Sequence, residues 1–225
     1  MFITLEGPEG SGKTTQIGPL AEFLRDQGYD VLTTREPGGT RIGEQVRGIL
    51  HSLENTSMHP RTEALLFQAA RAQLTAQVIR PHLEKGGIVL SDRFADSTLA
   101  YQGYGHGLPL DALRTIIAFA AGGLQPDLTL LLDVAVEVGL QRRAAGGEWN
   151  RLDAYAIEFH RRVQTGYAAL AAADPQRWVK INAGQPPEEV QQAIQQVVQE
   201  RIRVGKKPVN PLPTMAAVTD RLPSR

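Results

Sequence analysis

The residues most able to do chemistry lie near the N-terminus, where a glycine, four further residues and Gly-Lys-Thr follow one another. In such a loop the backbone N–H groups and the positive end of the following helix converge on a phosphate. Lys13 would reach the β- and γ-phosphates of a nucleoside triphosphate, and the Thr14 hydroxyl would bind Mg²⁺. A glycine-rich turn without a ligand is the alternative interpretation. The predicted nucleotide-binding residues are Gly7, Pro8, Glu9, Gly10, Ser11, Gly12, Lys13 and Thr14.

An aspartate and an arginine follow the apolar segment Ile88–Ser91. Asp92 has the position in which phosphate-loop enzymes hold a metal, usually through water, and the adjacent Arg93 could grip the phosphate of an acceptor. Asp133, at the end of Leu128–Leu132, is the alternative metal ligand. We favour Asp92 because Arg93 beside it would pair metal binding with binding of the acceptor phosphate.

Arginine accounts for 19 of the 24 basic residues. Composition alone can explain that bias, but several arginines follow predicted strands or turns. These are Arg35, Arg93, Arg142, Arg143 and Arg151. Guanidinium groups make bidentate hydrogen bonds to phosphate and keep their charge near neutral pH. Such groups could stabilise a phosphoryl group during its transfer.

Short apolar segments alternate with helix-length stretches along the chain. The predicted strands are Phe2–Glu6, Asp30–Thr34, Ile88–Ser91, Leu128–Asp133 and Trp178–Asn182. The predicted helices are Lys13–Gln27, Thr62–Glu84, Asp111–Ala121, Val136–Ala144, Asp153–Ala172 and Pro187–Ile202. This alternation predicts a three-layer α/β fold, with a five-stranded parallel sheet and helices on both faces. Ligands of such a fold bind beyond the carboxyl ends of the strands.

The composition is that of one ordinary globular domain. The 225 residues include 24 Lys and Arg and 24 Asp and Glu, so no overall basic field argues for nucleic acid or an anionic membrane as a partner. There is no cysteine, which excludes disulfides and thiolate chemistry. Because no signal-peptide pattern and no apolar run of ~20 residues is found, we expect a soluble cytoplasmic protein.

The C-terminal segment differs from the rest of the chain. We expect residues 1–202 to form one domain and residues 203–225 to form a basic, proline-containing tail. The tail has five basic residues against Asp220, a net charge of +4, and four prolines. We interpret it as an extended tail, and an arm that packs on a partner subunit is the alternative.

Five segments together resemble bacterial thymidylate kinase, and they occur in the order of that family. Two are highly specific: Arg35-Glu36-Pro37-Gly38-Gly39-Thr40 and the run from Asp92 to Gly103. The others are residues 2–14, Glu63–Phe67 with Arg71, and Asn150–Asp153. The resemblance spans almost all of residues 1–202. It implies the P-loop NTPase fold and a nucleoside monophosphate kinase domain.

The resemblance also implies a site for thymine. Phe67 would stack on the base, Arg71 would bond a thymine carbonyl oxygen, and Gln102 would address the ring N–H. Tyr101 would lie near the 2′ position of the sugar, where it disfavours a ribose hydroxyl. The same wall would include Ser97 and Thr98. Core packing is the alternative role for Phe67.

For the acceptor phosphate, the resemblance implies that Arg47 and Arg93 hold it and that Glu36 lies in the associated loop. Glu9 would accept a hydrogen bond from the 3′-hydroxyl of the acceptor. Position 10 is glycine, whereas some relatives have arginine there. The basic groups would therefore come from a mobile lid at residues 142–151. The implied catalytic residues are Lys13, Arg93, Arg142, Arg143 and Arg151.

The implied reaction moves the γ-phosphoryl group of MgATP to dTMP, giving dTDP for dTTP synthesis. ATP would bind residues 7–14, with Mg²⁺ held by Thr14 and, through water, by Asp92. The resemblance further implies a homodimer, whose surface the helices Thr62–Glu84 and Asp111–Ala121 could supply. A kinase for another nucleoside monophosphate or a deoxynucleoside is the alternative. A regulatory GTPase or a DNA-associated ATPase is a remote one, since the chain has no Asn-Lys-x-Asp motif and only the tail is basic.

Overall fold

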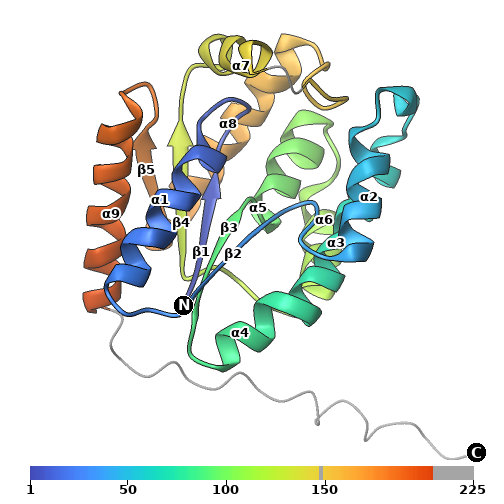
Figure 1. Ribbon diagram of the computed structural model, residues 1–225. Coiled ribbons are helices and arrows are strands. Elements are labelled where there is room, and N and C mark those ends of the chain that lie inside the picture. The colour runs from blue at the N-terminus through green and yellow to red at the C-terminus, as the bar shows by residue number, and fades with distance from the viewer. Residues whose placement is uncertain (147–148, 205–225) are drawn as a thin grey trace, which may run out of the picture.

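The computed structural model describes residues 1–146 and 149–204, which fold as a three-layer α/β structure (Figure 1). Within these residues a parallel five-stranded sheet has the order β2-β3-β1-β4-β5. Its strands are β1 Phe2–Glu6, β2 Val31–Arg35, β3 Ile88–Asp92, β4 Leu128–Asp133 and β5 Trp178–Asn182. The predicted fold class is confirmed, and the strand bounds differ from the predicted ones by at most one residue.

Helices cover both faces of the sheet. One face is covered by α1 (Lys13–Asp26) and α9 (Pro187–Val204). The other face is covered by α3 (Pro60–Leu74), α4 (Arg80–Glu84), α6 (Leu110–Ala121), α8 (Ile157–Ala173) and the π-helical segment η3 (Leu99–Gly105). The remaining elements are α2 (Arg41–His51), η1 (Leu53–Asn55), η2 (Thr75–Ile79), α5 (Ala95–Thr98) and α7 (Val136–Ala145).

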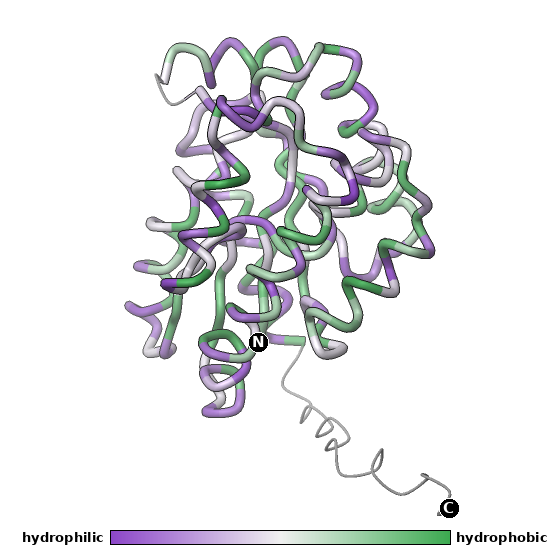
Figure 2. The backbone as a smooth tube through the Cα atoms, turned by 90° about the vertical axis from the view of Figure 1, so that its right-hand side faces the viewer, coloured by the Kyte–Doolittle hydropathy of each residue, from purple (hydrophilic) through white to green (hydrophobic). Residues whose placement is uncertain are grey.

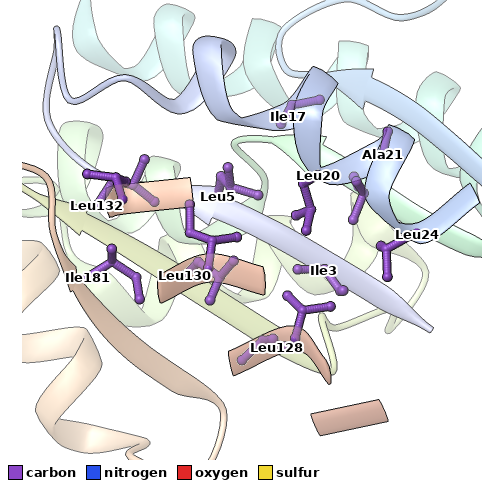
Figure 3. Close-up of a cluster of buried hydrophobic side chains, with 14 of the residues drawn as sticks. Ile3, Leu5, Ile17, Leu20, Ala21, Leu24, Leu128, Leu130, Leu132 and Ile181 are labelled. Atoms are coloured by element: carbon purple, nitrogen blue, oxygen red, sulfur yellow. The ribbon is translucent and has the colours of Figure 1, made fainter. Parts of the chain in front are cut away.

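The three central strands β1, β3 and β4 are buried on both faces, as parallel strands between helical layers must be, whereas the edge strands β2 and β5 each have exposed residues. Ile3 and Leu5 of β1 pack toward α1, against Leu20 and Leu24 (Figure 3). Phe2 packs on the opposite face. In Figure 2 the helices alternate between hydrophilic and hydrophobic residues along their length, which is typical of amphipathic elements. Burial of these two apolar layers fixes the sheet that carries the site.

Three predicted elements differ from the structure, and one further helix was not predicted. The predicted helix Thr62–Glu84 begins at Pro60 and is divided into α3, the π-helical η2 and α4. The predicted helix from Asp153 begins only at Ile157, because residues 151–155 form turns and a bend. The segment Arg41–His51 is a helix that the sequence reading did not propose. Finally, α9 continues to Val204, so the first two residues assigned to the tail are helical, and residues 205–225 lie outside the described part.

The carboxyl ends of the strands meet at one edge of the sheet. Leu5 and Arg35 both pair with Asp92, and Glu6 pairs with Leu131. The segment that connects β1 to α1 leaves from this edge, beneath α7 in Figure 1. The sheet therefore brings residues 7–14 next to Asp92 and the residue that follows it.

Candidate active site

Glycines shape the loop between β1 and α1, because side chains would collide there with neighbouring backbone. Gly7 has φ +144°, and a Cβ on it would lie 2.4 Å from the carbonyl oxygen of Leu132. Gly10 has φ +65°, and its Cβ would lie 1.9 Å from the carbonyl oxygen of Gly139 in α7. Both the positive φ and the close approach require glycine. An arginine at position 10 would therefore need α7 to lie farther away.

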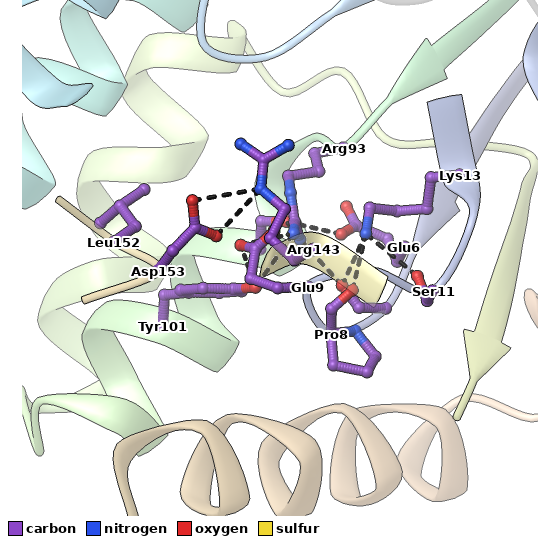
Figure 4. Close-up of polar contacts among 12 residues, drawn as sticks. Glu6, Pro8, Glu9, Ser11, Lys13, Arg93, Tyr101, Arg143, Leu152 and Asp153 are labelled. Atoms are coloured by element: carbon purple, nitrogen blue, oxygen red, sulfur yellow. Dashed lines mark hydrogen bonds and ion pairs between the residues drawn. The ribbon is translucent and has the colours of Figure 1, made fainter. Parts of the chain in front are cut away.

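The Lys13 ammonium group is turned back into this loop (Figure 4). Its Nζ donates hydrogen bonds to the carbonyl oxygens of Gly7 (3.1 Å) and Pro8 (2.8 Å) and to Oγ of Ser11 (3.1 Å). Burial, and next the nearby charge of Arg93, lowers the pKa of Lys13 from 10.5 to about 8. A buried cation whose hydrogen-bond partners are all neutral attracts an anion. The loop is thus well suited to a phosphate group.

A cavity of about 810 Å³ opens beside the loop, near the upper end of the range for small-molecule sites. Most of the predicted site residues line it, namely Glu9, Gly10, Ser11, Gly12, Lys13, Thr14, Glu36, Arg47, Phe67, Asp92, Arg93, Ser97, Thr98, Tyr101, Gln102, Arg142 and Arg143. Four predicted site residues are not part of its lining: Gly7, Pro8, Arg71 and Arg151. The fold therefore gathers residues from six separate parts of the chain around one space.

Arg93 lies at the centre of the polar contacts in this cavity (Figure 4). Its Nη1 donates to the carbonyl oxygen of Gly7 (2.9 Å) and to the hydroxyl of Tyr167 (2.9 Å), and its Nη2 donates to Oε1 of Glu9 (2.9 Å) and to the hydroxyl of Tyr101 (3.0 Å). Although burial opposes it, the charge of Arg93 lowers the pKa of Glu9 to about 2. Within the described residues, Arg93 is also the one non-glycine residue with positive φ, at +71°. Such strain persists only where the surrounding structure holds it.

Glu6, the last residue of β1, holds the segment that follows Arg93. Its Oε1 accepts a hydrogen bond from the backbone N–H of Phe94 (2.8 Å). Its Oε2 accepts from Oγ of Ser97 (2.6 Å) and from the hydroxyl of Tyr167 (3.0 Å). Because Tyr167 also contacts the guanidinium of Arg93, the buried Glu6 carboxylate supports both the backbone and the side chain of that arginine.

Glu6 is expected to make folding stability depend on pH. Burial, followed by the charge of Asp96, raises the pKa of Glu6 from 4.5 to about 7. The folded protein then binds a proton at Glu6 more tightly than the unfolded chain does. Protonation of Glu6 therefore stabilises the fold fully below pH 4.5, and this stabilisation is lost as the pH rises to about 7. We expect Glu6→Gln to remove about 1–3 kcal/mol of this pH dependence between pH 5 and 7.5, measured by urea unfolding.

The control for Glu6→Gln is Glu137→Gln, which changes an exposed glutamate paired with Arg161 on the surface. That variant should keep the pH dependence of the wild type. Equal slopes of unfolding free energy against pH for Glu6→Gln and the wild type would contradict the prediction.

Thr14 and Asp92 form the oxygen-rich corner of the cavity. The Thr14 hydroxyl donates to Oδ2 of Asp92 at 2.5 Å. The part of the chain that the structure describes holds no cluster of three or more His, Cys, Asp or Glu able to bind a metal. One hydroxyl and one carboxylate are nevertheless the type of donor set with which Mg²⁺ binds alongside water and phosphate oxygens. The alternative ligand Asp133 does not line this cavity and instead pairs with Lys180 at 2.6 Å.

The far side of the cavity combines an aromatic ring with polar groups. Phe67, Thr98 and Gln102 line it. Arg71, predicted to bond a base carbonyl, is fully buried behind this wall. Its five N–H groups can all be accounted for by protein acceptors: the Glu36 carboxylate, Oε1 of Gln68, Oγ1 of Thr98 and the carbonyl oxygen of Phe94. Arg71 could therefore reach a base only by exchanging one of these partners.

The arginines of the predicted lid have different environments. Arg142 donates to the carbonyl oxygen of Ala183 at 2.9 Å, and Arg143 pairs with Asp153 at 3.1 Å; both line the cavity. Arg151 is buried and pairs with Glu63 at 2.6 Å, away from the cavity lining. The structure thus does not bring Arg151 to the position expected of a catalytic residue. Residues 147 and 148 of this segment lie outside the described part.

Comparison with known proteins agrees with this geometry. The family model described as thymidylate kinase matches residues 5–194. The chain belongs to the thymidylate kinase family. It is 53% identical over 212 residues to thymidylate kinase of Roseiflexus castenholzii, covering 88% of this chain and 93% of that one. It is also 54% identical over 207 residues to thymidylate kinase of Thermomicrobium roseum, covering 92% and 98%. A crystal structure of thymidylate kinase from Ehrlichia chaffeensis has a TM-score of 0.72 and 35% identity, covering 88% of this chain and 98% of that one.

Membership of the thymidylate kinase family confirms the resemblance, the P-loop fold and the assignment to phosphotransferases. The activity of this family is ATP-dependent phosphorylation of dTMP to dTDP. Within residues 1–146 and 149–204, none of the helices combines the length and apolar character that crossing a membrane requires.

Sequence reasoning missed several residues of this thymidylate kinase site. Glu6 could have been noticed as a carboxylate at the end of an apolar strand. His51 lines the cavity, and burial together with the charge of Arg47 lowers its pKa to about 4, so it is neutral near pH 7. No pattern in the sequence could have indicated the contacts of Glu63, whose partners lie 39 and 88 residues away.

Proposed function

We propose that this chain transfers the γ-phosphoryl group of ATP to dTMP and thereby supplies dTTP synthesis. The observation that carries this proposal is the placement of two cations around one cavity, Lys13 at the start of α1 and Arg93 after β3. Two polyanionic nucleotides can meet head to head between them. Family membership makes ATP and dTMP the expected pair.

The chemistry requires little beyond alignment and charge. The acceptor phosphate of dTMP is anionic near neutral pH, so no strong general base is needed. Lys13 would exchange its neutral partners for an oxygen of the donor phosphate. Arg93 would exchange Glu9 for the acceptor phosphate, which releases the Glu9 carboxylate to accept a hydrogen bond from the 3′-hydroxyl. These exchanges create the strongest contacts where charge develops during transfer.

The remaining predicted residues fit around these two cations. We propose that Arg47 supports the acceptor phosphate, that Phe67 stacks on thymine and that Tyr101 crowds the 2′ position of the sugar. Arg142 and Arg143 would neutralise the transferring group once a closed lid excludes water. Arg151 has a different role in this proposal, as support for the site from behind.

Mg²⁺ is the metal that the site fits best. We propose that the Thr14 hydroxyl binds it directly and that Asp92 holds it through water. When bound, Mg²⁺ offsets negative charge on the phosphates. The hydrogen bond between Thr14 and Asp92 keeps both oxygen donors together before any metal arrives.

We further propose that the protein forms a homodimer through α2, α3 and α6. These helices pack side by side (Figure 1) and carry exposed large apolar side chains. The most exposed are Phe119 at 89%, Leu65 at 58%, Ile42 at 51% and Ile49 at 47% of their surface. Large apolar side chains exposed on neighbouring helices favour a protein partner over solvent. The cytoplasmic location and the absence of nucleic-acid and membrane partners stay predictions from the sequence.

A coupled ADP-release assay with dTMP, dUMP, dCMP and AMP tests the reaction. We expect the highest kcat/KM with dTMP, because the site offers an aromatic floor and an amide for a pyrimidine. A preference for dCMP or AMP would overturn the choice of acceptor. Calorimetry provides the control: heat from ATP binding without heat from dTMP binding would reduce the protein to a general nucleotide binder.

A further inference from the structure

Glu63 is a buried carboxylate with an unusual number of donors around it. Its Oε1 accepts hydrogen bonds from Nε2 of Gln102 (2.7 Å) and lies 3.2 Å from Nε2 of His106. Its Oε2 accepts from Nη2 of Arg151 (2.6 Å) and from the hydroxyl of Tyr155 (2.9 Å). Although burial opposes it, the hydrogen bond and charge of His106, with the other donors, lower the pKa of Glu63 to about 2. The group is therefore ionised near neutral pH and accepts hydrogen bonds only.

An acceptor-only neighbour determines which end of the Gln102 amide faces it. The NH₂ group must point to Glu63, so the amide oxygen is the end left for the cavity that Gln102 lines. Within the described residues this oxygen, Oε1, has no hydrogen-bond partner from the protein. The cavity wall near Phe67 thus offers a hydrogen-bond acceptor and not a donor.

An acceptor at this place discriminates between pyrimidines. The N3 atom of thymine carries a proton and can donate to Oε1, whereas N3 of cytosine is itself an acceptor and would be repelled. A buried polar group that faces the wrong partner costs more than a missing contact does, so the discrimination is large.

We infer that Glu63 is a positioning residue that sets the base specificity of the site by fixing the orientation of the Gln102 amide. Arg151 contributes to this orientation, because its guanidinium can only donate hydrogen bonds and therefore requires an acceptor at Oε2 of Glu63. This inference rests on the proposed function and assigns Arg151, predicted to be catalytic, to the same support.

The variant Glu63→Gln should invert the orientation of the Gln102 side-chain amide. The oxygen of the introduced amide must face the Arg151 guanidinium, so the NH₂ group of that amide must face Gln102. Gln102 then turns its own oxygen to the introduced amide and presents its NH₂ group to the cavity. We expect the ratio of kcat/KM for dTMP to that for 5-methyl-dCMP to fall by at least about tenfold. These two acceptors share the C5 methyl group and differ only along the edge that includes N3.

Tyr155→Phe is the matched control, because it removes one donor to Glu63 but leaves the carboxylate and its contact with Gln102. Its ratio should equal that of the wild type. If Glu63→Gln does not fold, Glu63→Gln/Arg151→Met carries the test. Both orientations of the introduced amide are then allowed, and we expect a smaller fall of about threefold. An unchanged ratio in the folded variant overturns the inference, whereas a wild type without activity on dTMP overturns the proposed function instead.

Discussion

Replacing Arg93 by glycine is expected to lower kcat/KM for dTMP by about a thousandfold or more, which corresponds to about 4 kcal/mol of transition-state stabilisation. The guanidinium is buried against the loop between β1 and α1, where it contacts Gly7 and Glu9, and in the proposed function it binds the acceptor phosphate. Glycine is the better replacement than alanine because the backbone at this position has φ +71°. The variant should therefore stay folded, which its melting temperature and its circular dichroism spectrum would check.

Two further variants separate charge from geometry at Arg93. Arg93→Lys keeps the charge but loses the forked set of donors, so it should recover only part of the activity. Arg114→Ala removes an exposed arginine that contacts Asp111 on the surface of α6, and it should leave turnover unchanged. Turnover close to that of the wild type in Arg93→Gly would contradict the role given to this residue.

The sequence predicted the sheet well because its strands are short and the three central ones, β1, β3 and β4, are apolar and buried on both faces. Leu128–Asp133 and Trp178–Asn182 have the predicted bounds. The helix Arg41–His51 was missed because two glycines interrupt its pattern and its apolar residues are few. Its Thr40 cap, which accepts a hydrogen bond from the Gly43 N–H at 2.9 Å, is a local signal that could have indicated it.

The candidate site was predictable where chemistry is local in the sequence. Residues 7–14 form one loop and the start of α1, and Asp92 and Arg93 lie at the end of one strand, so their types and order indicate what they contact. Sequence patterns do not indicate the contacts of a side chain whose partner is another distant side chain. Arg71 and Arg151 both have the guanidinium that phosphate or a base carbonyl attracts, yet each is buried against a glutamate, Glu36 or Glu63. No spacing rule reveals such pairs, because their members lie 35 and 88 residues apart.

These buried ion pairs explain why a chain with no net charge can hold polyanions. Three cations that line the cavity, Lys13, Arg47 and Arg142, donate hydrogen bonds to neutral oxygens. The glutamates that do approach the site, Glu6 and Glu9, are occupied with Phe94, Tyr101 and Arg93. Local arrangement, rather than overall composition, thus creates the positive potential.

Lys13→Met is expected to abolish nearly all activity while leaving the protein at least as stable as the wild type. Without the ammonium group, transfer should slow by about a thousandfold, because no other side chain of the loop supplies a positive charge to the donor phosphates. Stability should not fall, since burial lowers the pKa of Lys13 to about 8 and the folded state therefore disfavours its charged form. A functional group held at the expense of stability is common in active sites.

The pH dependence provides the decisive measurement for Lys13→Met. A base whose folded-state pKa is lowered destabilises the folded protein below pH 8, and this effect disappears as the pH rises through 8 toward 10.5. The difference in unfolding free energy between Lys13→Met and the wild type should therefore shrink above pH 8. The control is Lys180→Met, which removes an exposed lysine of β5 that pairs with Asp133. This variant should keep the turnover of the wild type, and its unfolding free energy should depend on pH above 8 as that of the wild type does. A Lys13→Met protein that is both active and less stable would show that the ammonium group serves the fold and not the phosphate.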